Sequence, residues 1–239
     1  MSKRAVILAG GLGTRLRPYT VVLPKPLMPI GPYPILEVII RQLAFHKFEH
    51  VTLAVNHQAD IIRAFFNDGS KWGIHIDYSL ETVPLSTIAP LKLIKDLPDN
   101  FILMNGDILT DLNFTKLYDD HVENHRLFTI SAAERKHLVD YGVLKSNSEG
   151  ELTGFEEKPS LNYLVSMGVY AVNKAALDHV PEDRKYGFDN LMTDLLAMKR
   201  PVHVVPYRGY WLDIGRVDDY ATAVEEFEQR KSLFLPDGS

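Results

Sequence analysis

The chain of 239 residues is long enough to bury one complete core, and its hydrophobic fraction of 46% fits a globular α/β domain. Its 26 lysine and arginine residues against 31 aspartate and glutamate residues give a formal charge of −5, which argues against a general nucleic-acid surface. The absence of cysteine excludes disulfides and thiolate metal sites. The first apolar run ends at Gly10, too early for a signal peptide, and no segment approaches a membrane span. We therefore expect a cytoplasmic protein that binds neither membranes nor nucleic acid.

The N-terminal segment joins an apolar strand to a glycine-rich turn. The run Ala5–Leu8 is typical of a buried central strand, and glycine follows at positions 10, 11 and 13. Glycines there allow positive φ and bring bare N–H groups close to a bound oxyanion. Arg15 adds a fork of donors and Lys25 a mobile charge, and both suit a polyphosphate. The segment predicts a phosphate-binding turn.

Helical and strand-like segments then alternate through the first half of the chain. We predict helices at 34–47 and 60–67, and strands at 51–55, 72–78 and 101–104. This alternation predicts an α/β fold with a doubly wound, mostly parallel, Rossmann-like sheet flanked by helices. Ligands of such sheets bind beyond the carboxyl ends of the strands, and both the Gly10 turn and Asp107 fall at such ends.

From about residue 128 the pattern becomes rich in strands. Residues 152–155 and 164–172 are predicted strands, and 218–231 is a predicted helix with an apolar stripe. No internal repeat is present. We expect a single domain over residues 1–239, with two halves at about 1–127 and about 128–239, of which the second is rich in strands.

The glycine turn belongs to a longer signature. Residues 10–20 and 24–27 match the pattern G-G-x-G-T-R-L-x-P-x-T followed by P-K-P-L at every fixed position. In this the chain resembles the sugar-1-phosphate nucleotidyltransferases, also called NDP-sugar pyrophosphorylases. Further matches follow in the family's order at 105–107, 155–159 and 211–215, so the resemblance spans nearly the whole chain. It implies transfer of a nucleoside monophosphate from a nucleoside triphosphate to a sugar 1-phosphate, with release of pyrophosphate. It also implies that the half at about 1–127 binds the nucleotide and that the half at about 128–239, with the C-terminal helix, binds the sugar phosphate.

The resemblance also assigns roles to residues. Arg15 and Lys25 are the expected catalytic residues. Asp107 and Asp213 are the expected ligands of Mg²⁺, and two carboxylates at strand ends suit such a hard cation. The expected nucleotide-binding residues are Leu8, Ala9, Gly10, Gly11, Gly13, Thr14, Arg15, Glu81, Ser86, Thr87 and Gly106. The expected sugar-phosphate-binding residues are Gly142, Glu157, Lys158, Ser166 and Gly168.

Two segments depart from the family pattern. In the base-reading loop, Ser86 and Ala89 replace glycines and Ile88 replaces a small residue. The added side chains restrict φ and are expected to narrow the space beside the base. Ser166 stands where the family usually has asparagine, which shortens the reach of that hydrogen-bonding group.

The substrate stays open between several alternatives. The glutamate-led loop at 81–87 and the segment 213–216 favour GTP with mannose or heptose 1-phosphate, in a protein similar to mannose-1-phosphate guanylyltransferase. Thymidylyl, uridylyl or cytidylyl transfer, a non-sugar phosphate acceptor and a non-catalytic regulatory subunit that binds nucleotide sugars are the alternatives. The chain is expected to be a monomer or a homodimer.

Several other residues receive a structural interpretation. His121 and His125 are four apart on a predicted helix, but no third metal ligand is evident, so we interpret them as part of a solvated helix face. Trp72 is expected to pack in the core and Trp211 to support Asp213. His57 follows a predicted strand without an identifiable partner.

Overall fold

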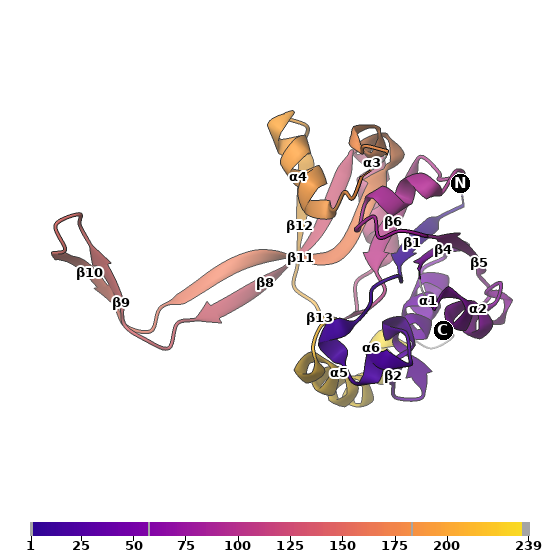
Figure 1. Cartoon of the computed structure of the whole chain (residues 1–239), viewed down its shortest axis with the longest axis horizontal. Coiled ribbons are helices and arrows are strands. Elements are labelled where there is room, and N and C mark those ends of the chain that lie inside the picture. The colour runs from indigo at the N-terminus through magenta and orange to yellow at the C-terminus, as the bar shows by residue number, and fades with distance from the viewer. Residues whose placement is uncertain (1, 57, 183, 236–239) are drawn as a thin grey trace.

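A seven-stranded sheet runs through the body of the protein, and a long two-stranded arm projects from it (Figure 1). The computed structural model describes residues 2–56, 58–182 and 184–235, so His57 lies outside the described residues. The strand order is β12-β8-β11-β6-β1-β4-β5. The strands of this sheet are β1 (Arg4–Leu8), β4 (His50–Val55), β5 (His75–Leu80), β6 (Asn100–Asn105), β8 (Phe128–Leu138), β11 (Ser160–Asn173) and β12 (Val202–Tyr207).

Most neighbours in the sheet are parallel. β1 pairs in parallel with β4 and β6, β4 with β5, and β12 with β8, whereas β11 is antiparallel to both β6 and β8. Three small ladders complete the strands: β2 (Pro29–Ile30) with β3 (Tyr33–Pro34), β7 (Ile108–Thr110) with β13 (Trp211–Asp213), and β9 (Val143–Ser146) with β10 (Leu152–Glu156). The predicted α/β class with a mostly parallel sheet is confirmed.

Side chains on the central strands alternate between two hydrophobic cores, because successive residues of a strand point to opposite faces. In β1, Ala5 and Ile7 enter one core and Val6 the other. The first core is closed by α1 (Ile35–Phe45), α2 (Ala59–Phe66), α3 (Phe114–Glu123), α5 (Val217–Gln229) and α6 (Lys231–Phe234). The second is closed by α4 (Phe188–Ala197) and the 3₁₀ helices η5 (Ala89–Leu93) and η6 (Lys174–His179). No helix among the described residues has the length and apolar character needed to cross a membrane.

Helices and strands observed in the body follow the predicted order, with some boundaries shifted. The strand predicted from residue 72 begins at His75, because Ser70–Trp72 form the 3₁₀ helix η4 and Gly73 adopts a φ of 67°. Trp72 packs against Phe66, as expected, and its indole N–H donates to Glu37. Sequence analysis did not identify α4 or β12, both of which lie in the second half.

The interpretation of His121 as a solvated residue is wrong. His121 lies on α3 with no exposed surface, and its Nδ1 is 2.8 Å from the Thr129 hydroxyl of β8. His125 lies just beyond the end of α3 and is exposed. Burial, with a further contribution from Arg126, lowers the pKa of His121 to about 4.

This shift predicts a loss of stability in acid. Below a pH of about 6.5 the unfolded chain protonates His121 while the folded protein keeps it neutral, so stability falls between pH 6.5 and 4 by about 2–3 kcal/mol. We expect His121→Gln to remove most of this pH dependence, measured as the free energy of unfolding in denaturant at pH 7.5 and 4.5. His125→Gln is the matched control and should behave like the wild type. An unchanged pH dependence in His121→Gln would contradict the assignment.

Candidate active site at the carboxyl edge of the sheet

The glycine turn follows β1 at the carboxyl edge of the sheet. Leu8 ends the strand, and the Ala9 N–H donates to the carbonyl of Ala54 at 2.8 Å, which fixes where the turn begins. Gly13 has a φ of 60°, and a Cβ there would lie 2.8 Å from Thr20 Cγ2. The Thr20 hydroxyl donates to the Gly13 carbonyl at 2.7 Å. The turn therefore requires glycine at position 13 for both conformation and space.

Two short 3₁₀ helices carry the predicted catalytic cations. Thr14 and Arg15 lie in η1 (Thr14–Leu16), both exposed, whereas Leu16 anchors the segment in the core. Lys25 begins η3 (Lys25–Leu27) and is only 9% exposed. The exposed Arg15 guanidinium can reach a ligand, while Lys25 is held inside the site.

Asp107 lies beyond the end of β6 and forms an ion pair with Lys25 through Oδ2. The preceding Gly106 N–H donates to the Leu8 carbonyl at 3.1 Å. A Cβ on Gly106 would approach the same carbonyl to 3.1 Å, so glycine allows β6 and β1 to end side by side. Among the described residues, the other oxygen of Asp107, Oδ1, is buried without a hydrogen-bond partner.

Asp213 reaches the same edge through the β7–β13 ladder, in which it pairs with Ile108. The Ile214 N–H donates to the Asp107 carbonyl at 3.0 Å, which places the two aspartates next to each other. A Cβ on Gly215 would lie 3.4 Å from Arg15 Nη2, so the guanidinium rests against this glycine. Trp211, on β13, donates its indole N–H to the Met167 carbonyl and positions the ladder that carries Asp213.

The charges of this group are coupled. Burial raises the pKa of the Asp213 carboxyl, and the nearby negative charge of Asp107 raises it further. Lys25 and Arg15 oppose this increase, in that order. The four side chains predicted as catalytic or metal-binding are therefore brought together, with two carboxylates that repel each other.

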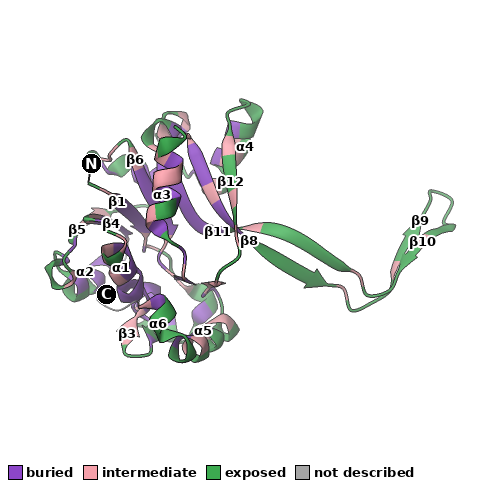
Figure 2. Cartoon of the chain, turned by 180° about the vertical axis from the view of Figure 1, so that it is seen from behind, coloured by how far each residue is buried: buried purple, intermediate pink, exposed green. Residues whose placement is uncertain are grey.

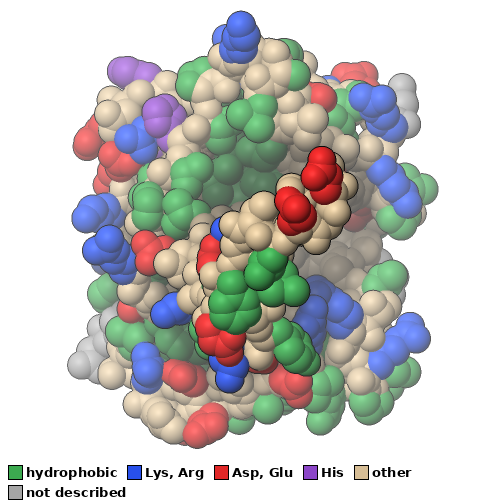
Figure 3. Space-filling view, turned by 90° about the vertical axis from the view of Figure 1, so that its left-hand side faces the viewer, with side chains coloured by type: hydrophobic (Ala, Val, Ile, Leu, Met, Phe, Trp, Pro, Cys, Tyr) green, Lys and Arg blue, Asp and Glu red, His purple; other side chains and the backbone are tan. Residues whose placement is uncertain are grey.

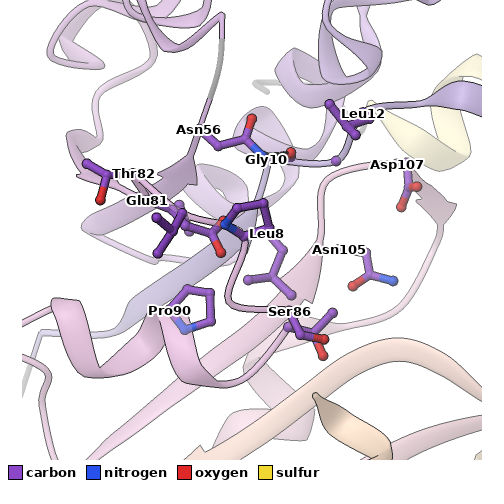
Figure 4. A pocket seen from close by; sticks show the side chains of 15 residues that line it. Leu8, Gly10, Leu12, Asn56, Glu81, Thr82, Ser86, Pro90, Asn105 and Asp107 are labelled. Atoms are coloured by element: carbon purple, nitrogen blue, oxygen red, sulfur yellow. Dashed lines mark hydrogen bonds between the residues drawn. The ribbon is translucent and has the colours of Figure 1, made fainter. Parts of the chain in front are cut away.

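A pocket of about 560 Å³ opens beside this group (Figure 4). The Gly10 turn and Asn56 lie on one side of it, Glu81 and Ser86 come from a second loop, and Asp107 lies at one end. Of the predicted nucleotide-binding residues, the pocket is lined by Leu8, Gly10, Gly11, Glu81, Ser86 and Thr87. This volume is typical of a small-molecule site.

Asn56 and Asn105 also line the pocket. Neither was among the predicted site residues, although Asn105 begins the matching segment 105–107. The Asn56 amide donates to the Gly10 carbonyl, and a Cβ on Gly10 would lie 3.1 Å from the same amide nitrogen. Both asparagines stand at the carboxyl ends of parallel strands, β4 and β6, and this position was the signal that could have identified them.

The 81–90 loop is fixed to the segment before α4. Within the loop, the Glu81 carboxylate accepts the Leu85 N–H. The N–H groups of Ile88 and Ala89 both donate to the Tyr186 carbonyl, at 3.1 and 3.0 Å. The Thr87 hydroxyl accepts the Phe188 N–H at 2.9 Å. Hydrogen bonds from the backbone and from the side chains of Glu81 and Thr87 thus connect the loop internally and to this segment.

The three departures in this loop have different consequences. Ser86 adopts a φ of 77°, the conformation for which glycine is the usual residue, and its side chain lines the pocket. Ile88 has no exposed surface and Ala89 is 4% exposed, and both pack in the second core. Ser86 is therefore the replacement that affects the pocket, while Ile88 and Ala89 serve packing.

The predicted sugar-phosphate residues fall into two groups. A Cβ on Gly168 would lie 2.6 Å from the Asn105 amide nitrogen, so β11 approaches the site there. The Ser166 hydroxyl accepts the Gly168 N–H at 3.3 Å and is 3.0 Å from the Tyr170 hydroxyl. The second group, Gly142, Glu157 and Lys158, lies on the projecting arm, which is exposed along most of its length (Figure 2).

The arrangement suits a hard cation and a polyphosphate. Asp107 Oδ1 is buried and has no hydrogen-bond partner among the described residues. The raised pKa of Asp213 means that its negative charge is unfavourable there, and a bound cation would stabilise that charge. The described residues contain no cluster of three or more histidine, cysteine or acidic side chains. The protein can therefore supply two carboxylates, and phosphate oxygens and water would complete the coordination of an ion such as Mg²⁺.

Comparison with solved structures places this geometry in a known fold. The structure titled HddC from Yersinia pseudotuberculosis is 26% identical, with a TM-score of 0.74, and the match covers 94% of this chain and 99% of that one. A second structure of that protein is in complex with GMP-PN and has a TM-score of 0.73. A putative glucose-1-phosphate thymidylyltransferase from Bacillus anthracis, at 19% identity and a TM-score of 0.75, shares the fold.

Sequence relatives point the same way. A UTP–glucose-1-phosphate uridylyltransferase from Synechocystis sp. is 31% identical, over 98% of this chain and 66% of the relative. A mannose-1-phosphate guanyltransferase from Yarrowia lipolytica is 31% identical, over 91% of this chain and 62% of the relative. The chain thus spans slightly less than two thirds of the length of these relatives. The family model described as nucleotidyl transferase matches residues 4–230, and the chain belongs to this nucleotidyl transferase family.

Proposed function

We propose that the protein transfers a nucleoside monophosphate from a nucleoside triphosphate to a sugar 1-phosphate and releases pyrophosphate. The observation that carries the proposal is the assembly of Arg15, Lys25, Asp107 and Asp213 beside the glycine turn and its pocket. Phosphoryl chemistry depends mainly on positioning and on stabilisation of charge. This cluster provides both and requires no covalent nucleophile.

Each part of the site has a distinct task in this reaction. The turn at residues 9–13 offers backbone N–H groups to the phosphates, and the Arg15 guanidinium contacts the charge that develops on the departing pyrophosphate. Lys25, fixed by its ion pair with Asp107, contributes positive charge at the α-phosphate. The sugar phosphate oxygen attacks the α-phosphorus, and the bond to the pyrophosphate oxygen breaks. Lys158 and Glu157 bind the phosphate and the hydroxyls of the sugar.

Asp107 and Asp213 are the residues that would hold Mg²⁺. The ion, when bound, would neutralise charge on the phosphate oxygens and, as a Lewis acid, polarise the phosphoryl group that is attacked. The buried, unpartnered Oδ1 of Asp107 supports this role, as does the raised pKa of Asp213.

For the substrates, we propose GTP with mannose or heptose 1-phosphate. Relatives at 30–32% identity include mannose-1-phosphate guanyltransferases from fungi, plants and animals. A structure of the similar protein HddC from Yersinia pseudotuberculosis is in complex with GMP-PN, and the name of this ligand contains GMP, a guanine nucleotide. The relative named as a uridylyltransferase makes UTP with glucose 1-phosphate the first alternative.

One assay tests the proposal. The protein is incubated with Mg²⁺, one of GTP, UTP, dTTP or CTP, and one of a panel of sugar 1-phosphates, and pyrophosphate release is measured. We expect release with at least one pair, fastest with GTP. If the protein binds a nucleotide or a nucleotide sugar but releases no pyrophosphate from any pair, it is instead a non-catalytic regulatory subunit.

A substitution in the 81–90 loop is expected to change the affinity for the triphosphate. We expect Ser86→Gly to change the KM for the triphosphate by a factor of about 3–10, which corresponds to about 1 kcal/mol. The Ser86 side chain lines the pocket, and its positive φ is a conformation that glycine adopts more readily. Ala89→Gly is the matched control: it should lower stability by about 1 kcal/mol, since it removes a buried methyl and adds backbone freedom, and leave KM unchanged. Steady-state kinetics and thermal melts measure both. If the two variants have the same KM for the triphosphate, Ser86 does not contribute to the binding of the triphosphate in this pocket.

A further inference from the structure

Residues 134–164 form an arm that stands out from the body (Figures 1 and 2). Its base is a ribbon of β8 and β11, with consecutive cross-strand pairs from Ala132↔Ser166 to Leu138↔Ser160. Its tip is the β9–β10 hairpin. A register shift between Ser166 and Tyr170 marks the place where the ribbon leaves the sheet, as bulges commonly do at bends.

The ribbon keeps the tip away from the site of its own chain. Gly168 contacts Asn105 at the site, whereas Ser160 lies at the far end of the ribbon. The six residue steps between Ser166 and Ser160 correspond to about 20 Å of extended strand. Lys158 and Glu157 lie beyond that end, so the paired ribbon separates them from Asp107 of the same chain.

The arm carries an apolar surface that its own chain does not cover. Leu144 and Phe155 are a cross-strand pair, and Leu152 pairs with Ser146 on the same face. Large hydrophobic side chains that are 43–78% exposed occur at Leu138, Tyr141, Leu144, Leu152, Phe155, Leu161, Tyr163 and Leu164. A two-stranded hairpin alone is marginally stable, and monomers rarely expose apolar surface of this extent. The arm is therefore built to lie against protein.

The body offers a matching surface around the pocket. Two large apolar side chains that line the pocket, Leu12 and Val83, are 59% and 58% exposed. Tyr19, Val21 and Val22, which follow the glycine turn along the chain, are 52–78% exposed. Seen along the arm, the body is hollowed beside the base of the arm, and hydrophobic side chains line the hollow (Figure 3). The acidic pair Asp107 and Asp213 lies at the same edge of the sheet, so a phosphate and its cation bound there would meet an incoming lysine.

We propose that the occupant of this surface is the arm of a second copy of the chain. Each copy inserts its arm into the site of the other, so that Gly142, Glu157 and Lys158 of one copy complete the sugar-phosphate site of its partner. Reciprocal exchange closes the assembly with two-fold symmetry and leaves neither arm exposed. The inference rests on the proposed function, because it assigns the arm residues to the sugar phosphate and the body residues to the triphosphate.

Complementation between two inactive variants tests this directly. Asp107→Asn, with a defective body, and Lys158→Ala, with a defective arm, are co-expressed with different tags and purified through both tags. Each variant alone should be nearly inactive. In the mixed dimer one site combines an intact body with an intact arm from the other copy, so we expect about half of the wild-type pyrophosphate release.

Two controls define the result. Pairing Asp107→Asn with the double variant Asp107→Asn, Lys158→Ala should restore nothing, because no site is then intact. Lys145→Ala, which removes another exposed lysine of the arm tip, should leave activity and assembly unchanged.

A mixed dimer without activity would overturn the proposal, since that is the outcome if each arm serves its own chain. Failure to recover any mixed species would also overturn it.

A second measurement does not depend on activity. By sedimentation at micromolar concentration we expect a dimer for the wild type and a folded monomer for the variant Leu144→Glu, Phe155→Glu. A monomeric wild type, or a dimer unaffected by these arm substitutions, would refute the arm exchange. If the wild type is an arm-dependent dimer that releases no pyrophosphate with any substrate pair, the proposed function fails while the interface stands.

Discussion

Asp107→Asn is expected to reduce turnover about 1000-fold, which corresponds to about 4 kcal/mol of transition-state stabilisation. The amide keeps the shape of the side chain but removes the charge that pairs with Lys25 and the carboxylate oxygen, Oδ1, that is buried without a partner among the described residues. The Mg²⁺ concentration needed for half-maximal activity should rise. The measurement is pyrophosphate release over a Mg²⁺ titration.

Asp119→Asn is the matched control for this experiment. Asp119 forms an ion pair with Lys3 at the surface, and its side chain is 45% exposed, so the same chemical change is made away from the site. It should retain wild-type kinetics. A folded Asp107→Asn protein with a turnover within about threefold of the wild type, a difference of less than 1 kcal/mol, would exclude Asp107 as a metal ligand.

Arg15→Ala is expected to reduce kcat/KM about 10- to 100-fold without a change in stability. The guanidinium is exposed and rests against Gly215, so its removal leaves no cavity in the core. It removes charge-assisted hydrogen bonds to the phosphates, each worth about 1.5–3 kcal/mol. Steady-state kinetics with varied triphosphate, together with thermal melts, measure both quantities.

Arg17→Ala provides the comparison for Arg15→Ala. Arg17 is also exposed and follows η1 directly, so the two variants lose the same charge within one short segment. Only Arg15 is placed beside Asp213, whose pKa it lowers. Equal kinetic losses in the two variants would point to a general effect of positive charge near the pocket rather than to a specific contact.

Local patterns predicted the parts of the fold that depend on neighbouring residues. The strand at residues 5–8 and the turn that follows could be predicted because buried strands and glycine turns have local signatures. The alternation of Ile74 and Ile76 with polar residues led to a predicted strand from residue 72, although Gly73 ends a 3₁₀ helix there and β5 begins at His75. Neither α4 nor β12 was identified.

Contacts between distant segments limited the remaining predictions. His121 was interpreted as exposed because no third metal ligand was evident near it in the sequence, whereas its hydrogen-bond partner Thr129 comes from β8, a different element. The direction of the arm is likewise absent from the sequence pattern, because a hairpin has the same alternation whether it folds back or projects. Asn56 directly follows a predicted strand, which marks it as a candidate, but its hydrogen bond to Gly10 depends on the pairing of β4 with β1.

The β7–β13 ladder also bears on the order in which the site is made during folding. It joins segments that are far apart in the sequence: the Thr110 hydroxyl donates to the carbonyl of Tyr210, 100 positions later. Contacts of such long range carry a high loop-closure entropy and tend to form late. A nascent chain that has emerged only as far as α4 has the glycine turn, Lys25 and Asp107, but it lacks the second carboxylate. Metal-dependent nucleotide binding would thus report that synthesis of the sheet and its C-terminal ladder has been completed.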